Sequence, residues 1–121
     1  MRILFDLNVL LDASIRWRKF PGSLQLYNRV LADAALEGAF PGCGYTTLYY
    51  ILKQELSDLD ARAVVSNFAT RLKLLPFTPR IADHAQRLEM PDLEGACVAA
   101  TALHGHCSWI ATRDPAGFRN S

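Results

Sequence analysis

Two aspartates follow predicted strands that lie at opposite ends of the sequence. Asp6 comes directly after the apolar run Arg2–Phe5, and Asp114 follows the run from Trp109 to Thr112. If the two strands are parallel neighbours, their carboxylates converge at one edge of the sheet. Converging carboxylates repel each other unless a hard cation such as Mg²⁺ or Mn²⁺ lies between them. Such an ion lowers the pKa of a bound water and positions a phosphodiester for hydrolysis. The pair therefore points to a metal-assisted hydrolase.

Acids at strand ends are also ordinary loop residues, so this interpretation depends on the elements that position them. Apolar runs predict short strands at residues 2–5, within 38–44, at 74–75 and at 109–112. Helical spacing, with a capping residue at the start and Gly at several ends, predicts helices over residues 23–38, 48–56, 61–73, 79–88 and 92–105. Strands that alternate with helices favour the α/β class, with a central parallel sheet between two helical layers in a three-layer α/β/α arrangement.

The composition is that of one folded domain covering residues 1–121. Half of the residues are apolar and 21% are charged, which is typical of a protein with a hydrophobic core. The net charge of +1 does not indicate a dedicated nucleic-acid-binding protein, which usually carries a basic excess. A small enzyme, however, needs only a local basic rim. No apolar stretch is long enough for a membrane helix, so we expect a cytoplasmic protein with no membrane partner.

Three segments carry motifs in a characteristic order and spacing. The run from Leu4 to Asp12 contains an Asp, any residue and an Asn directly after the first strand. The segment from Asp92 to Leu103 is an apolar helix that opens with acids. The last, Ile110–Phe118, holds a strand followed by Thr-Arg-Asp. Taken together, these segments resemble the PIN domains, and the similarity extends over nearly the whole chain.

The resemblance implies a small nuclease. PIN domains gather three or four carboxylates around one or two divalent ions and cleave single-stranded RNA. Many are toxins of bacterial toxin–antitoxin pairs, often dimeric and held inactive by an antitoxin protein. By this resemblance Asp6 and Asp114 match the first and fourth acidic positions and are the expected ligands of Mg²⁺ or Mn²⁺. Asn8 matches a polar residue that supports the first acid, and we group it with Thr112 and Arg113 as candidate substrate-binding residues.

The acidic set of the family is incomplete in this chain. By the same resemblance the second acid falls at Thr47 or a neighbour, and the third falls at Gly95, which has no side chain to bind a metal. Asp92 lies three residues before Gly95 and is also placed to cap its helix. Glu94 is adjacent to Gly95 but lies about 100° around the helix. Recruitment of either one would add a catalytic acid to the pair at the strand ends.

Three functions therefore stay open at the level of the sequence. The first is an active metal-dependent ribonuclease of the toxin type. The second is a catalytically silent PIN-like domain that binds RNA or a protein, and the third is a different α/β module that resembles the family by accident. The missing acids favour the second. Asp6, Asn8 and Asp114 have no evident structural need, and their presence favours the first.

The helix that begins near Thr46 is rich in aromatic residues. Tyr45, Tyr49 and Tyr50 are expected either to pack in the core or at a dimer contact, or to line a groove for a nucleotide. Because exposed apolar patches mark interfaces, these residues make a homodimer one of the expectations for this chain.

Overall fold

The sheet has four parallel strands in the order β3-β2-β1-β4. We describe a computed structural model, which covers residues 1–14, 20–114 and 118. The strands are β1 Arg2–Phe5, β2 Glu37–Pro41, β3 Lys73–Leu75 and β4 Trp109–Ala111. The first and last strands of the chain are therefore hydrogen-bonded neighbours, with Phe5 in register with Ala111.

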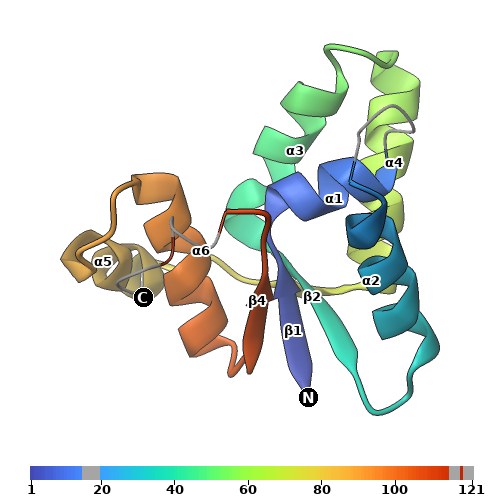
Figure 1. The fold of residues 1–121 in the computed structure, drawn as a ribbon. Coiled ribbons are helices and arrows are strands. Elements are labelled where there is room, and N and C mark those ends of the chain that lie inside the picture. The colour runs from blue at the N-terminus through green and yellow to red at the C-terminus, as the bar shows by residue number, and fades with distance from the viewer. Residues whose placement is uncertain (15–19, 115–117, 119–121) are drawn as a thin grey trace.

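Helices cover both faces of this sheet (Figure 1). One layer contains α1 Leu7–Ser14, α2 Pro21–Ala32, α3 Tyr45–Leu52 and α4 Asp58–Arg71, and the other contains α5 Pro79–Arg87 and α6 Leu93–His104. A 3₁₀ turn, Gly42–Gly44, joins β2 to α3. The α/β class and the three-layer arrangement with a central parallel sheet are confirmed. None of the described helices is long and apolar enough to cross a membrane.

Successive side chains of a strand point to opposite faces of the sheet, so β1 contributes residues to two hydrophobic cores. Phe5 packs with Phe40 and the apolar side chains of α1 to α4. Leu4 packs on the other face with Ala39, Leu75 and the buried residues of α6. The central strand is thus buried on both sides, as its uninterrupted apolar sequence predicts.

The predicted starts of α5 and α6 are correct to within one residue, whereas α4 begins at Asp58, three residues before its predicted start; a capping residue precedes each of the three helices. The side chains of Ser57, Thr78 and Asp92 accept hydrogen bonds from the backbone of the first turns of α4, α5 and α6. Satisfying these backbone donors is the reason for the preference for such residues at helix starts. Gly105 ends α6, also as predicted.

The bounds predicted for α2 are wrong at both ends. The helix begins at Pro21, whose fixed φ suits a first helical position, and the predicted cap Ser23 lies inside it. The helix stops at Ala32, and Gly38, the predicted stop, lies in β2. A Cβ at Gly38 would lie 2.7 Å from a methyl group of Leu72 and 3.0 Å from the ring of Phe5. Close packing between the sheet and its helices therefore explains this glycine better than a helix end does.

Two of the three tyrosines in α3 lie outside the core, whereas Tyr49 packs against it. Tyr45 and Tyr50 are 39% and 64% exposed, and they line an open cavity of about 380 Å³ between α3 and α4. The expectation that these tyrosines are buried in the core is wrong for both. The other two expectations for these tyrosines, a groove and a contact with another molecule, both place them at the surface.

Candidate metal centre

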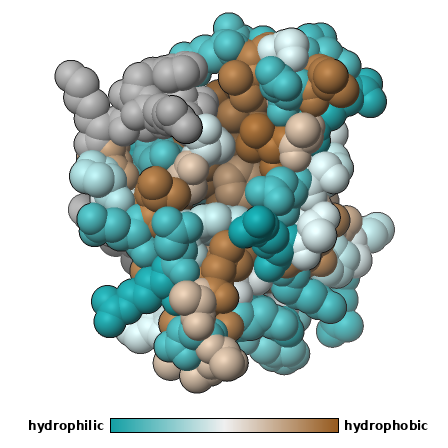
Figure 2. Space-filling view, turned by 90° about the vertical axis from the view of Figure 1, so that its right-hand side faces the viewer, coloured by the Kyte–Doolittle hydropathy of each residue, from teal (hydrophilic) through white to brown (hydrophobic). Residues whose placement is uncertain are grey.

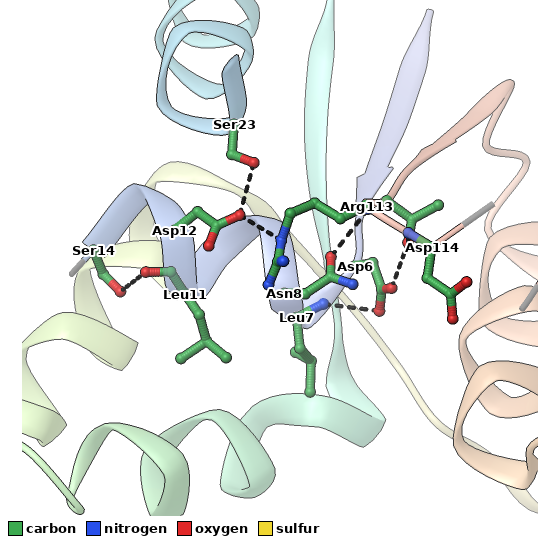
Figure 3. Close-up of polar contacts among 10 residues, drawn as sticks. Asp6, Leu7, Asn8, Leu11, Asp12, Ser14, Ser23, Arg113 and Asp114 are labelled. Atoms are coloured by element: carbon green, nitrogen blue, oxygen red, sulfur yellow. Dashed lines mark hydrogen bonds and ion pairs between the residues drawn. The ribbon is translucent and has the colours of Figure 1, made fainter. Parts of the chain in front are cut away.

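Asp6 and Asp114 leave the sheet at the same edge. Asp6 follows β1 and Asp114 follows β4. Because these two strands pair in parallel, their carboxyl ends lie at the same edge of the sheet. The backbone N–H of Asp6 donates to the carbonyl oxygen of Ala111 at 2.9 Å, which extends the ladder past the end of β1. Figure 3 shows the two carboxylates on these neighbouring strand ends.

Thr112 links the two aspartates. Its hydroxyl donates to Oδ2 of Asp6 at 2.8 Å and accepts from the backbone N–H of Asp114 at 3.0 Å. The other oxygen of Asp6 accepts from the backbone N–H of Leu7 at the start of α1, at 2.9 Å. Each oxygen of the half-buried Asp6 is therefore held in place by one hydrogen bond, and each keeps a further lone pair.

Four acidic residues line one cavity of about 300 Å³, namely Asp6, Asp92, Glu94 and Asp114. The remaining walls are formed by Leu7, Asn8, Leu11, Thr47, Ile51, Gly95 and Phe118. All four acids suggested by the sequence therefore reach the same space. The two positions where the family resemblance expects further acids, Thr47 and Gly95, reach it as well. The strand ends and the start of α6 bring the acids to this cavity, whereas α1 and α3 bring a mixture of apolar and neutral polar side chains.

The acids of this cavity act on one another. The pKa of Glu94 is raised, first by burial and then by the negative charges of Asp92 and Asp6. Asp92 also accepts a hydrogen bond from the backbone N–H of Gly95 at 3.1 Å, so it caps α6 and lines the cavity at the same time. A cation in this space would relieve the repulsion among these charges.

The donor set suits a hard divalent ion bound with much of its water. Carboxylate oxygens are the preferred ligands of Mg²⁺, which needs only one or two of them when a substrate phosphate takes part. Among the described residues, no three His, Cys, Asp or Glu side chains are arranged to hold an ion by themselves. The residues present therefore fit one weakly held ion better than a two-ion site.

Arg113 does not line this cavity. Its guanidinium lies over the ring of Phe20, 4.3 Å from the ring centre. Its Nε lies 2.6 Å from Oδ2 of Asp12, a contact of two opposite charges in which the N–H is not aligned for a hydrogen bond. Its backbone N–H donates to Oδ1 of Asn8 at 3.4 Å. The side chain grouped above with the substrate-binding residues is thus engaged with α1 and the start of α2 (Figure 3).

Sequence reasoning missed Asp12 and Ser23. Asp12 has a fully buried side chain, and the hydroxyl of Ser23 donates to its Oδ2 at 2.9 Å. A signal for Asp12 was present, because residues four apart in a helix share a face and Asp12 follows Asn8 by four. No local pattern relates Ser23 to either residue, since its contact depends on how α2 packs on α1.

Comparison with known proteins agrees with this fold and these motifs. The sequence model of the family described as PIN domain matches residues 2–116. No curated protein sequence matches the chain. Among solved structures, one similar chain comes from the crystal structure of VapBC2 from Rickettsia felis bound to a DNA fragment from their promoter. The two share 10% sequence identity and a TM-score of 0.70, over 94% of this chain and 89% of the other. On the match over residues 2–116, this chain belongs to the PIN domain family.

Proposed function

We propose that this PIN domain is a divalent-metal-dependent endoribonuclease that hydrolyses single-stranded RNA, of the kind found in toxins. One observation carries the proposal: Asp6, Asp92, Glu94 and Asp114 come from three separate parts of the chain and line a single cavity. Gathering four negative charges without a cation is unfavourable, and the charges of Asp92 and Asp6 add to the effect of burial in raising the pKa of Glu94. Such a gathering has a use when a cation and an anionic substrate complete the site.

In this proposal Asp6 and Asp114 hold the ion, and Asp92 and Glu94 contribute charge from the start of α6. Mg²⁺ or Mn²⁺, when bound, supplies an activated water and neutralises charge on the phosphate. The hydroxyl of Thr112 and the backbone N–H of Leu7 keep the Asp6 carboxylate in one orientation. Asn8 lies beside this carboxylate in the wall of the cavity, and its amide N–H₂ is a donor suited to a phosphate oxygen.

The alternative is a catalytically silent PIN domain that binds RNA or a protein. Thr47 and Gly95 favour it, since both line the cavity at positions where the resemblance expects acids. Neither can bring a negative charge to an ion. The alternative and the ribonuclease differ in one measurable property, the affinity of the wild-type protein for a divalent ion.

The test combines calorimetric titration with Mn²⁺ and cleavage of a fluorescent single-stranded RNA. We expect a measurable affinity, and cleavage that stops when EDTA is added. Asp6→Asn should abolish cleavage and weaken Mn²⁺ binding at least about tenfold. Asp83→Asn is the control, because Asp83 is 70% exposed on α5 and pairs with Arg87 away from the cavity. If the wild type gives no heat of Mn²⁺ binding and does not cleave the RNA at millimolar Mn²⁺, the ribonuclease proposal is wrong and the silent alternative stands.

We also propose an antitoxin protein as a partner and a homodimer as the assembled form, both in the cytoplasm. The similar R. felis chain was crystallised as part of VapBC2, which supports a protein partner.

The homodimer is supported by the described surface, which has large exposed apolar side chains on α2, α3 and α4, among them Leu24, Leu26, Tyr50 and Leu59. Figure 2 shows apolar side chains gathered on the face that carries α2 and α4. Light scattering on the purified chain should give the mass of two copies; a single copy at all concentrations would contradict the dimer.

A further inference from the structure

The segment that carries Asp114 lies beyond the last strand. The register of β4 with β1 ends at the pair Phe5 and Ala111, so residues 112–114 are outside the ladder. Backbone pairing of the kind that holds a strand is therefore not what fixes Asp114. Side chains that follow β1 contact this segment instead, at Thr112 and at Arg113.

These contacts join the motif that follows β1 to the Thr-Arg-Asp motif that follows β4. The carboxylate of Asp6 accepts from the hydroxyl of Thr112. The amide oxygen of Asn8 accepts from the backbone N–H of Arg113. One turn further along α1, the carboxylate of Asp12 pairs with the guanidinium of Arg113. Three polar side chains at the start of the chain thus hold two consecutive residues near its end (Figure 3).

The last of these contacts is the most buried. The side chain of Asp12 has no exposed surface, and that of Arg113 is 27% exposed. Ser23 donates to Oδ2 of Asp12, while Oδ1 has no hydrogen-bond partner among the described residues. A buried carboxylate needs compensation for its lost hydration, and in the described part of the chain Arg113 is the cation that provides it.

Arg113 and Asp114 are adjacent but project into different places. Arg113 lies between Asp12 and the ring of Phe20, whereas Asp114 lines the acidic cavity. In an irregular segment the direction of one side chain depends on how its neighbour is held. With Arg113 anchored on α1 and α2, Asp114 faces the cavity that Asp6 also lines.

We infer that Asp12 and Arg113 are positioning residues, whose buried ion pair anchors the Thr112–Asp114 segment so that Asp114 lies beside Asp6. Arg113 acts through Asp114 rather than on the substrate. The inference rests on the proposed function only where it concerns the use of Asp114 as an ion ligand; the anchoring itself is a property of the fold.

Two single variants, each of which removes one charge of the pair, separate positioning from a simple charge effect. Asp12→Asn removes a negative charge and Arg113→Gln removes a positive one, so Coulomb's law alone would shift cation affinity in opposite directions. Loss of positioning would shift it in the same direction, with both variants weakening Mn²⁺ binding by about tenfold or more. Arg87→Gln and Asp83→Asn are the matched controls, since they break an exposed ion pair on α5.

The anchoring is measured independently of any ion by amide hydrogen exchange in EDTA. The N–H groups of Arg113 and Asp114 both donate to side chains in the wild type, so they should exchange slowly. Both variants should accelerate exchange at these two amides by about tenfold or more, while the amides of β1 and β2 stay protected.

A double variant excludes a folding artefact. Asp12→Leu with Arg113→Met removes the pair without leaving a buried charge, which is often neutral for stability. It should melt near the wild-type temperature and still lose protection at residues 113 and 114. Unchanged protection in a folded variant, or opposite shifts of Mn²⁺ affinity in the two single variants, would overturn the inference. If the wild type binds no Mn²⁺ but the variants lose protection, the anchoring stands and the proposed nuclease function fails.

Discussion

At the scale of single residues, Glu94 shows what it costs to gather acids around one cavity. Burial, Asp92 and Asp6 together raise the pKa of this carboxyl group. A raised pKa means that the folded protein binds the proton more tightly than the unfolded chain does. The charged form of Glu94 therefore destabilises the folded state above the ordinary pKa of a glutamate, and this penalty disappears as the pH falls below that value.

We predict that Glu94→Gln stabilises the ion-free protein at pH 7 and leaves its stability unchanged below about pH 4. The expected gain is small, about 1–3 °C in melting temperature, because Glu94 is on the surface. Thermal unfolding in EDTA at both pH values measures it. Glu89→Gln, outside the cavity, is the control. A lower melting temperature for Glu94→Gln at pH 7 would show that the acids do not repel one another.

A second prediction concerns the two wall positions that lack acids. Thr47→Glu together with Gly95→Asp adds two carboxylates to a cavity that both residues already line. Affinity for Mg²⁺ and Mn²⁺ rises with the number of charged ligands, so we expect the double variant to bind Mn²⁺ about tenfold more tightly or better. Calorimetry on both proteins in parallel checks this result. Equal affinities would mean that residues 47 and 95 do not project toward the ion.

Much of the site could be predicted at this scale, and the reason is local. Asp6 and Asp114 each follow an apolar strand, and the parallel pairing of the two strands puts both residues at one edge of the sheet. Asp92 and Glu94 were candidates only through the family resemblance, which puts the third acid at Gly95, and both line the same cavity. Asp12 was not singled out, because its importance comes from burial and from Arg113, which is 101 residues away (113 − 12). No window of sequence contains that contact.

At the scale of elements, the start of α6 has two tasks. The carboxylate of Asp92 accepts a hydrogen bond from the backbone N–H of Gly95, and Asp92 also lines the cavity. A negative charge at a helix start is favourable in itself, so the presence of an acid here does not by itself indicate an ion ligand. Only a variant that separates capping from charge can distinguish the two roles.

Asp92→Ser keeps a capping oxygen and removes the charge, whereas Asp92→Ala removes both. We predict that the Ala variant loses about 1 kcal/mol of unfolding free energy and that the Ser variant keeps most of it. If Asp92 also helps to hold the ion, both variants should weaken Mn²⁺ binding several-fold. Thr78→Ala, which removes the cap of α5, is the control for stability. Wild-type Mn²⁺ affinity in Asp92→Ser would restrict Asp92 to capping.

Element types were easier to predict than element ends. Capping residues marked the starts of α5 and α6 correctly, whereas α4 begins three residues before its predicted start. The apolar pattern failed where helices meet more than one neighbour. Helical spacing puts Leu93 and Leu103 on the apolar face of α6 with Ala96 and Ala100, yet the two leucines are 54% and 52% exposed. The buried residues are mostly small, including Ala96, Ala100 and Ala102, because α6 packs between the sheet and α5 at close range.

At the scale of the whole molecule, the tight contact between layers is most evident at Gly38. A Cβ there would approach side chains from α4's C-cap, from β1 and from α2. We predict that Gly38→Ala destabilises the protein by about 1–3 kcal/mol through overpacking. Gly22→Ala is the matched control, since nothing lies within 4 Å of its Cβ; it should be neutral or stabilising by up to about 1 kcal/mol. Urea unfolding measures both, and an equal effect of the two changes would contradict the packing argument.

The link between Asp6 and Thr112 joins residues that are 106 positions apart. Contacts of such long range require most of the chain to be ordered first, because closing a long loop carries an entropic cost that local contacts do not. During translation, β1 leaves the ribosome early but has no β4 to pair with. A nascent chain that stops short of residue 112 carries Asp6, Asn8 and Asp12 without their counterparts. If the proposed nuclease function holds, an incomplete copy of this protein would be harmless to the RNA of the cell that makes it.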